Sequence, residues 1–427
     1  MQIKSIVVRT LTVLSLIAVW FGFVFVSAFY GWWMKPVVTP GDSSAFFQHA
    51  VSLLESENGG GNSALVLIED GKISDDFYSV GAEEIDQETV FSTASLSKWI
   101  TAAAVMKLVQ DNKLGLDDPA AMYLTRWQFP PSEFEPDTVS IRHLLSHTAG
   151  LSDGLGFGDY FEDENLPSLE QTLNNPRTSS GDKVSLSVTE QPGSRWNYSG
   201  GSYLILELIV EEVSGAPFED FVQEEILDPL AMRRSTYQIL SSIDNNAGSY
   251  FNDGGPAPVY KYASSAATAF ATSAADLTRF ALAQFPESNV EGVLNSETVE
   301  SMRIPHGRTS GADIWGLGTM LYSPTPEGDF VFGHDGGNDP AINSTARINP
   351  STNDGIVLLE TGHPSIATQI GSDWVFWQTG YPDFLDTPAV ISSMALPAGI
   401  GTLVILIFAF VLLRKKPKRL KPTADNN

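Results

Sequence analysis

The segment Phe91-Ser-Thr-Ala-Ser-Leu-Ser-Lys98 opens a long run of apolar residues with helical spacing. It places Ser95 three residues before Lys98, and residues three apart share one face of a helix. The ammonium group of Lys98 can therefore lie beside the Ser95 hydroxyl, which is a weak nucleophile until a base takes its proton. A lysine held away from bulk water can assist as that base. The spacing makes Ser95 a candidate nucleophile, although a helix-capping serine and a solvated lysine show the same pattern.

A second motif is Tyr198-Ser-Gly-Gly-Ser-Tyr203, which follows the turn signal Pro192-Gly193. Apolar residues then recur with helical period and stop at Gly215, a residue type that commonly ends helices. Tyr198 is therefore expected in a loop directly ahead of a buried helix. A core tyrosine without any chemical role is the alternative interpretation.

A third motif is Phe332-Gly-His-Asp-Gly-Gly337, which follows the alternating run Asp329-Phe-Val-Phe. Alternation with glycine-rich turns predicts antiparallel strands between about Trp315 and Glu360. A histidine among glycines at a strand edge can approach a ligand closely, because glycine lets the backbone come near. We expect His334 to face the substrate and to titrate between about pH 5 and 8. A turn histidine without substrate contact is the alternative.

These motifs, in this order, resemble those of the serine β-lactamase and penicillin-binding-protein superfamily. The nearest branch is that of class C β-lactamases, D,D-peptidases and esterases. Further stretches are similar to family segments, namely Leu114–Pro119, Ile141–Leu151 and Ser265–Leu277. The resemblance extends from about Ser44 to about Tyr381.

The resemblance implies a catalytic role for several residues. Ser95 would be the acylated nucleophile and Lys98 its activating partner. Tyr198 would match the tyrosine of the Y-x-N motif, a general base in acylation. The backbone N–H groups of Ser95 and Gly337 would form the oxyanion hole.

Two positions depart from the family motifs. Gly200 stands where Y-x-N has asparagine, so a side-chain amide that usually contacts substrate is missing. His334, Asp335 and Gly336 match the K-T-G motif with histidine in place of lysine. A neutral imidazole is a weaker anchor for a substrate carboxylate than a permanent cation. The change argues mildly against an efficient β-lactamase and leaves the substrate class open.

The resemblance also implies an α/β (α+β) fold of the β-lactamase/transpeptidase-like type. An antiparallel sheet made from both ends of the domain would be flanked by helices, with a mainly helical subdomain inserted between. The sequence agrees, because Ser63–Ile73 reads as an apolar strand with an Asp-Gly turn. Helical patterns dominate from about Ser95 to Phe285.

Both ends of the chain predict N- and C-terminal transmembrane helices. Residues 10–34 carry no charge, and this segment is long enough to span a bilayer. It includes Trp32-Trp33, a residue type enriched at the membrane–water interface. A cleaved signal peptide with a site at Val26-Ser-Ala28 is the alternative. Residues from about Leu396 to Leu413 are apolar and precede the basic run Arg414–Arg419, a stop-transfer pattern.

These signals divide the chain into four parts. The parts are a membrane anchor or signal segment over 1–35, a serine hydrolase domain over 36–387, a transmembrane helix over 388–413 and a basic cytoplasmic tail over 414–427. Lys4 and Arg9 place the N-terminus inside by the positive-inside rule. The hydrolase domain would then lie on the periplasmic side of a bacterial inner membrane.

Composition excludes several classes of function. The chain has 25 basic and 51 acidic residues and a formal net charge of −26, which makes nucleic acid a poor partner. It has no cysteine, and its histidines form no H-E-x-x-H motif. We therefore expect no metal and no cofactor, and the family resemblance implies a small-molecule or peptide substrate. The sequence does not indicate an oligomeric state.

Together these features predict a membrane-tethered, exported serine hydrolase that acts through an acyl-enzyme. Its substrate would be an ester, a D-amino-acid peptide or a β-lactam amide. The alternative is a slow-turnover penicillin-binding sensor or a non-catalytic binding pseudoenzyme. The presence of Ser95, Lys98 and Tyr198 favours catalysis, whereas the altered His334 and Gly200 keep the alternative open.

Overall fold

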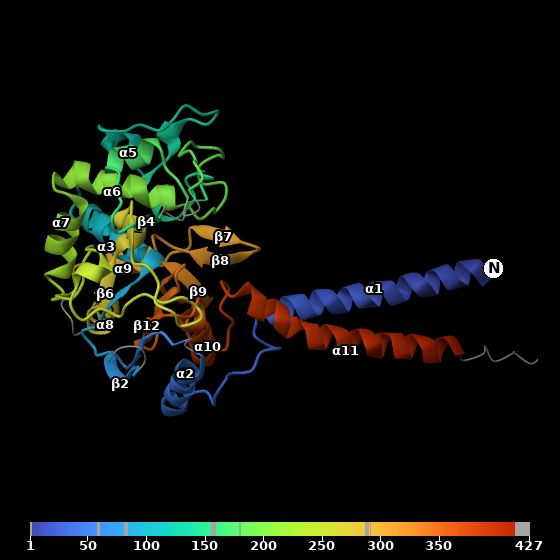
Figure 1. Cartoon of the computed structure of the whole chain (residues 1–427). Helices are drawn as coiled ribbons and strands as arrows, with labels where there is room; N and C mark the ends of the chain where they lie inside the picture. Colours follow the sequence, from blue (N-terminus) through green and yellow to red (C-terminus); the bar gives the residue numbers. More distant parts are fainter. Residues whose placement is uncertain are drawn as a thin grey trace, which may run out of the picture. The chain divides into compact units, whose positions relative to one another are not determined.

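The computed structural model describes residues 2–57, 60–80, 84–154, 159–178, 181–286, 290 and 292–414. The chain divides into a globular unit, Pro36–Thr379, and a helical unit made of Met1–Lys35 with Gly380–Asn427 (Figure 1). The globular unit thus ends at Thr379, ahead of the boundary at 387 expected from the sequence. Most of the expected basic tail, residues 415–427, lies outside the described residues.

The described part of the globular unit contains an eight-stranded antiparallel sheet in the order β2-β1-β12-β11-β10-β9-β8-β7 (Figure 1). Its strands are β1 (Ser63–Glu69), β2 (Lys72–Tyr78), β7 (Gly307–Thr309), β8 (Ala312–Trp315), β9 (Met320–Pro324), β10 (Phe330–Asn338), β11 (Ile342–Asn349) and β12 (Asp354–Thr361). The first hairpin and the late strands meet because β1 pairs with β12, with Ser63 opposite Glu360. This confirms the predicted sheet made from both ends of the domain.

The hairpin between β1 and β2 forms as the sequence predicts. Asp70 and Gly71 have φ angles of 49° and 70°, the positive values that a two-residue hairpin turn requires. Strand β1 is buried along nearly its whole length, as are β11 and β12. Helices cover these strands, namely α2 (Ser43–Glu57), α8 (Ala274–Leu282) and α10 (Ile366–Thr379).

Between β2 and β7 the described chain is mainly helical, as predicted. The helices are α3 (Ser97–Gln110), α4 (Ile141–Leu145), α5 (Leu169–Asn174), α6 (Gly200–Ser214), α7 (Phe218–Val222), α8 and α9 (Ser296–Met302). Single turns are η1 (Ala94–Leu96), η2 (Ala120–Tyr123), η3 (Pro136–Thr138), η4 (Gln223–Leu227), η5 (Leu240–Ser242) and η6 (Ser265–Ala269). This region also contains two short antiparallel strand pairs that the sequence did not predict. They are β3 (Val90–Ser92) with β6 (Ala271–Ser273), and β4 (Asp159–Phe161) with β5 (Tyr260–Tyr262).

Helix α3 lies in the core between the sheet and the helical region. Trp99 is fully buried and packs edge-on against Phe280 of α8 and Phe332 of β10. Burying such side chains contributes about 1.5–3 kcal/mol each. Helix α6 packs on α3 and α4, so the N-terminal ends of α3 and α6 are held by the same core.

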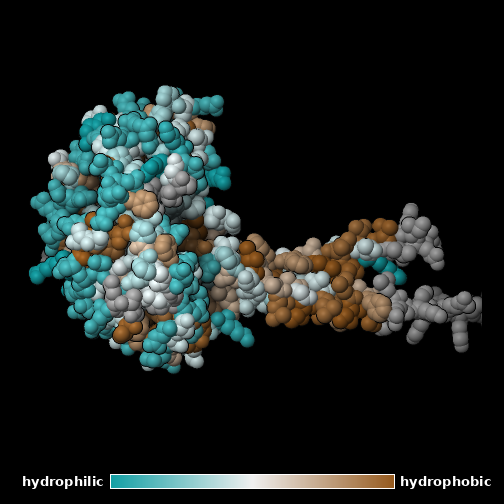
Figure 2. Space-filling view, in the orientation of Figure 1, coloured by the Kyte–Doolittle hydropathy of each residue, from teal (hydrophilic) through white to brown (hydrophobic). Residues whose placement is uncertain are grey.

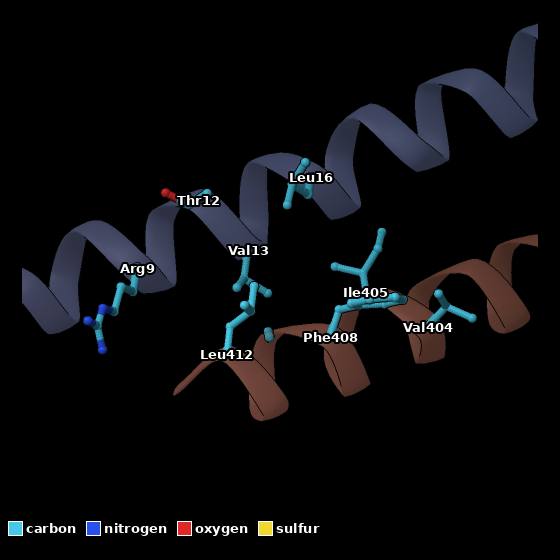
Figure 3. Close-up of a pocket in the computed structure, with 9 residues that line it drawn as sticks. Arg9, Thr12, Val13, Leu16, Val404, Ile405, Phe408 and Leu412 are labelled. Carbon is cyan, nitrogen blue, oxygen red and sulfur yellow. The ribbon is translucent and has the colours of Figure 1, made fainter. Parts of the chain in front are cut away.

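The helical unit consists of α1 (Gln2–Ala28) and α11 (Thr387–Arg414). Val7–Ala28 and Thr387–Leu412 are long and apolar enough to cross a membrane, although a signal sequence meets the same requirement at α1. Figure 2 shows the apolar colouring of these helices. The two helices pack together, because Trp20 Nε1 donates to the carbonyl of Pro397 at 3.1 Å. A mainly apolar pocket between them has Arg9 among its lining residues (Figure 3).

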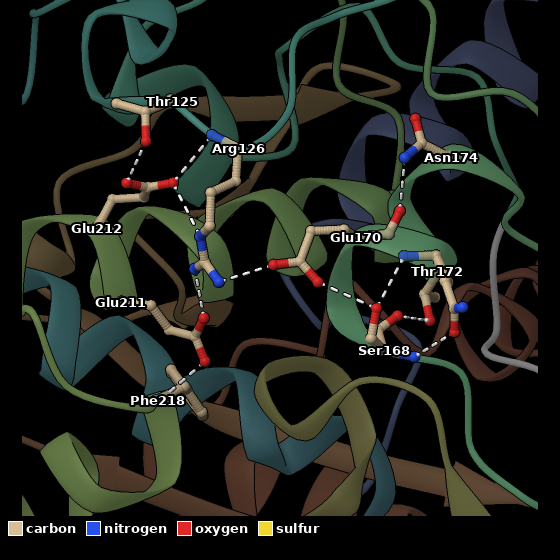
Figure 4. A network of polar contacts seen from close by, with 10 residues as sticks. Thr125, Arg126, Ser168, Glu170, Thr172, Asn174, Glu211, Glu212 and Phe218 are labelled. Carbon is tan, nitrogen blue, oxygen red and sulfur yellow. Dashed lines mark hydrogen bonds and ion pairs between the residues drawn. The ribbon is translucent and has the colours of Figure 1, made fainter.

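At the surface of the helical region, Arg126 ties three segments together (Figure 4). Its guanidinium contacts Glu170 of α5 at 2.7 Å, and Glu211 and Glu212 of α6 at 2.5 and 3.0 Å. A single exposed ion pair contributes little to the stability of a fold, whereas a network of several pairs on one guanidinium contributes more. The network holds the C-terminal half of α6 to α5 and to the segment that carries Arg126.

Candidate active site

Ser95 and Lys98 lie together at the N-terminal end of α3. Ser95 is in the turn η1 and is half-buried, whereas Lys98 is only 2% exposed. Lys98 Nζ donates to Ser95 Oγ at 3.2 Å and to the carbonyl of Ala267 at 2.9 Å. The spacing read from the sequence therefore brings the amine to the hydroxyl, within the distance that proton transfer needs.

The turn that carries Ser95 is held on both sides. Ala94 has a φ of 47°, a left-handed conformation that is uncommon for a residue with a side chain. Thr93 Oγ1 donates to the carbonyl of Phe270 at 2.8 Å, and Ser97 Oγ donates to that of Ala94 at 2.6 Å. The strained turn is thus fixed by Phe270, which directly precedes β6, and by the start of α3, and it presents Ser95 between β3 and α3.

Tyr198 approaches Lys98 from the segment ahead of α6. Lys98 Nζ lies 5.1 Å from the centre of the Tyr198 ring and 5.6 Å from that of Tyr203. Tyr198 is half-buried, so part of its ring remains accessible. The structure therefore brings the Ser95 hydroxyl and the Tyr198 ring to the buried amine of Lys98.

His147 belongs to this site, although sequence reasoning assigned it no role. Its Nδ1 accepts from the backbone N–H of Ser199 at 3.1 Å, and its carbonyl accepts from that of Asn197 at 2.8 Å. Its ring centre lies 4.5 Å from that of Tyr198. His147 therefore clamps the segment that carries Tyr198. The only sequence signal was its place in the family-like stretch Ile141–Leu151.

Burial keeps His147 uncharged. The ring is fully buried, and burial lowers the pKa of His147 well below its usual value. The neighbouring Lys98 and His334 act in the same direction. Because Nδ1 accepts a hydrogen bond, the neutral ring carries its proton on Nε2.

His334 lies on β10 with no exposed surface. Its Nδ1 lies 2.6 Å from the carbonyl of Asp335, and its ring packs edge-on against Trp315. Burial, assisted by the charge of Lys98, lowers the pKa of His334 to about 3. The expectation that it titrates between pH 5 and 8 was therefore wrong. The sequence could not show this, because the burial comes from residues far along the chain.

The rest of the K-T-G-like segment has two distinct environments. The Asp335 carboxylate accepts from Tyr322 Oη at 2.9 Å and pairs with Arg347 at 2.8 Å, so it stabilises the sheet. Gly336 lies so close to the nucleophile turn that an added Cβ would be 1.9 Å from the carbonyl of Thr93. Only glycine allows this approach. Gly337 follows and is exposed, and its pairing with Ser95 as an oxyanion hole stays a prediction.

Gly200 is the first residue of α6 and is buried. It follows Ser199, whose hydroxyl donates to Asp153 at 2.5 Å and accepts from the N–H of Ser202 at 3.0 Å. The N–H of Gly201 donates to the same carboxylate at 3.1 Å. A carboxylate at a helix N-terminus is stabilising, so Asp153 fixes the start of α6. Gly200 itself contributes no side-chain amide to the site.

Within the described ranges, no group of three or more histidine, aspartate or glutamate side chains is arranged to hold a metal ion. The chemistry available to this site comes from the serine, the buried lysine and the tyrosine. Their arrangement matches the S-x-x-K and tyrosine motifs of the sequence, which resemble those of the serine β-lactamase and penicillin-binding-protein superfamily. The Beta-lactamase family model matches residues 52–373, and the chain belongs to this family. The resemblance inferred from the motifs is thereby confirmed.

Curated relatives include an esterase and penicillin-binding proteins. Esterase EstB of Burkholderia gladioli is 30% identical over 190 residues, which is 40% of this chain and 44% of the esterase. Penicillin-binding protein 4* of Bacillus subtilis is 31% identical over 147 residues, 34% of this chain and 30% of the relative. The chain thus spans less than half the length of each of these relatives.

Solved structures share the fold over a longer stretch. The octameric penicillin-binding protein homologue from Pyrococcus abyssi superimposes with a TM-score of 0.62 and 24% identity, covering 79% of this chain and 78% of the homologue. The hydrolase EstCE1, with promiscuous acyltransferase activity, gives a TM-score of 0.62 and 21% identity, covering 78% of this chain and 98% of that protein. At these identities the likeness shows the fold, which confirms the predicted fold class.

Proposed function

We propose that the protein is a membrane-tethered serine hydrolase that forms an acyl-enzyme on Ser95, with uncharged carboxylic esters as its preferred substrates. The observation that carries the proposal is the contact of 3.2 Å between Lys98 Nζ and Ser95 Oγ. Family members are generally hydrolytic serine enzymes, and an esterase is among the relatives. D-amino-acid peptide amides and β-lactams are the competing substrates.

In the proposed reaction, Ser95 Oγ attacks the carbonyl carbon while its proton passes to the unprotonated amine of Lys98, or to Tyr198 after Tyr198 has passed its own proton to that amine. The N–H groups of Ser95 and Gly337 stabilise the oxyanion of the tetrahedral intermediate. Collapse of this intermediate expels the alcohol, which takes up the proton, and leaves an ester on Ser95. A water molecule then attacks the acyl-enzyme, releases the acid and restores the Ser95 hydroxyl.

The substrate preference rests on charge. In the family's K-T-G motif a lysine can meet a substrate carboxylate, and here His334 stands in that place. Because burial holds the pKa of His334 near 3, this ring is uncharged at neutral pH. Gly200 also offers no amide. A substrate carboxylate therefore gains little binding energy at positions 334 and 200, whereas the binding of a neutral ester does not depend on a charged partner there.

A slow-turnover penicillin-binding sensor is the second candidate. The same two positions favour it, because weakened substrate contacts slow deacylation as well as acylation. The two candidates differ in the lifetime of the acyl-enzyme. A sensor retains a fluorescent penicillin for hours without turning over any ester, and a hydrolase does not.

For membrane attachment we propose that α1 and α11 are both retained as spans. Trp20 of α1 packs directly against Gly401 of α11. A Cβ added to Gly401 would lie 2.0 Å from the Trp20 ring. This packing supports retention over cleavage. The basic residues Lys4 and Arg9, and those from Arg414 onward, would face the cytoplasm, and the hydrolase domain would then lie on the outer side.

The test is a hydrolysis panel on the full chain in detergent micelles. The substrates are p-nitrophenyl butyrate, a D-alanyl-D-alanine peptide and nitrocefin, with Ser95→Ala as the matched control. We expect the ester to have the highest kcat/KM and the alanine variant to be inactive. Faster turnover of nitrocefin would reject the ester preference, and an active alanine variant would reject the nucleophile.

A further inference from the structure

The second partner of Lys98 is a backbone carbonyl on the turn η6. Lys98 Nζ donates to the carbonyl of Ala267 at 2.9 Å, and Thr101 Oγ1, one turn further along α3, donates to that of Ala266 at 2.7 Å. These two contacts seat η6 against the buried face of α3. A shift of the turn would therefore move the carbonyl that holds the Lys98 amine beside Ser95.

The same turn is held from its other side by Glu207 of α6. Glu207 Oε2 accepts from Ser264 Oγ at 2.9 Å and from the backbone N–H of Ala266 at 3.0 Å. Ser264 Oγ in turn accepts from the N–H of Ala267 at 3.2 Å. Glu207 is buried, and the N–H that it binds belongs to Ala266, the residue before the one whose carbonyl binds Lys98.

We propose that Glu207 is a positioning residue for Lys98, acting through the segment 264–267 that both residues bind. The inference rests on the proposed role of Lys98 in activating Ser95. Glu207 does not touch Ser95 or the substrate region in this arrangement. It fixes the backbone carbonyl, the carbonyl fixes the amine, and the amine activates the hydroxyl.

The protonation state of Glu207 gives this link a distinctive signature. Burial raises the pKa of Glu207 to about 8. Glu211 on the same helix and Glu219 on α7 act in the same direction, and the Tyr237 hydroxyl is also within electrostatic reach. The side chain is thus a neutral acid at pH 7. Glu207 gains a negative charge as the pH rises through about 8. This charge lies in contact with the turn η6, whose Ala267 carbonyl holds Lys98.

The experiment measures the rate at which a fluorophosphonate probe labels Ser95 in the full chain in detergent, from pH 6 to 9.5. Glu207→Gln keeps an amide oxygen as acceptor but cannot ionise, and Glu207→Leu removes the acceptor. Glu212→Gln is the matched control, because Glu212 lies on the same helix and its carboxylate holds Arg126 instead of the turn η6. Thr101→Val loosens η6 independently, by removing the donor to Ala266.

We expect Glu207→Leu to slow labelling by about 10²-fold at every pH, since small misplacements of catalytic groups have effects of this size. Glu207→Gln should label within about threefold of the wild type at pH 7 and lose the inflection near pH 8. Glu212→Gln should keep both rate and inflection.

Wild-type labelling rates in Glu207→Leu, or an inflection that persists in Glu207→Gln, would overturn the inference. If Glu207→Leu does not fold, the pH profile of Glu207→Gln and the labelling rate of Thr101→Val test the inference in its place. Wild-type values for both would overturn it, because they would show that the turn η6 does not position Lys98. A wild-type chain that is not labelled on Ser95 would instead reject the proposed function.

Discussion

Gly336 offers a direct way to move the β10 strand away from the nucleophile without changing any reacting group. In Gly336→Ala the new Cβ would lie 1.9 Å from the Thr93 carbonyl oxygen and 3.0 Å from the Leu96 nitrogen. Both are backbone atoms, and an ordinary carbon–oxygen contact is about 3.3 Å or longer. The strand must therefore retreat from the turn by more than about 1 Å.

A displacement of this size should lower ester kcat/KM by about 10²-fold, which corresponds to about 2.7 kcal/mol of transition-state stabilisation. The strain should also lower the free energy of unfolding by about 1–3 kcal/mol. The assay is p-nitrophenyl butyrate hydrolysis by the full chain, with circular dichroism to confirm folding.

Gly255→Ala is the matched control, because its Cβ meets only the end of the Asp253 side chain at 3.1 Å. It should retain the wild-type rate. If Gly336→Ala is folded and its kcat/KM stays within about threefold of the wild type, β10 does not border the reaction as inferred here.

Other residues make further predictions. Lys98→Met should fold normally but label with fluorophosphonate about 10³-fold more slowly, because a positioned proton-transfer group contributes about 10²–10⁴-fold; equal labelling would show that Lys98 does not activate Ser95. His147→Phe leaves the Ser199 N–H without its acceptor, so thermal unfolding should show a loss of about 1–3 kcal/mol, and ester kcat should fall about tenfold; no change in either would remove His147 from the site. His334→Gln should leave the shape of the pH–rate profile between pH 5 and 8 unchanged, because burial already holds the pKa of His334 near 3; loss of an inflection in that window would contradict this. Burial raises the pKa of Glu360 from 4.5 to about 9, so folding takes up a proton and wild-type stability falls as the pH rises between these values. Glu360→Gln should flatten that dependence and be more stable by up to about 3.4 kcal/mol at pH 7; identical urea-unfolding curves for both proteins across this range would refute it.

The parts of the site that the sequence could predict are those set by local geometry. Ser95 and Lys98 are close because one helical turn separates them, so their spacing alone predicts their contact. The Asp70-Gly71 hairpin and the end of α6 at Gly215 follow from turn and helix-capping preferences in the same way. Tyr198 and His334 come from distant elements, and only the family resemblance linked them to Ser95.

What the sequence could not show depends on long-range packing. The lowered pKa of His334 follows from its burial and from the nearby Lys98 charge, which no local pattern reveals. His147 and Glu207 act through backbone hydrogen bonds to segments far along the chain. The pair β3–β6 was not predicted because strands of three residues are too short to show alternation.

The proposed acyl-enzyme can be observed directly by quenching the full chain in acid during steady-state hydrolysis of p-nitrophenyl butyrate and measuring intact and peptide masses. We expect a butyryl adduct on the peptide that contains Ser95, forming within the first turnover and disappearing when the ester is exhausted. The Ser95→Ala variant should show neither the adduct nor turnover. Continued ester hydrolysis by that variant, or an adduct located on any other residue, would contradict the assignment of Ser95 as the nucleophile.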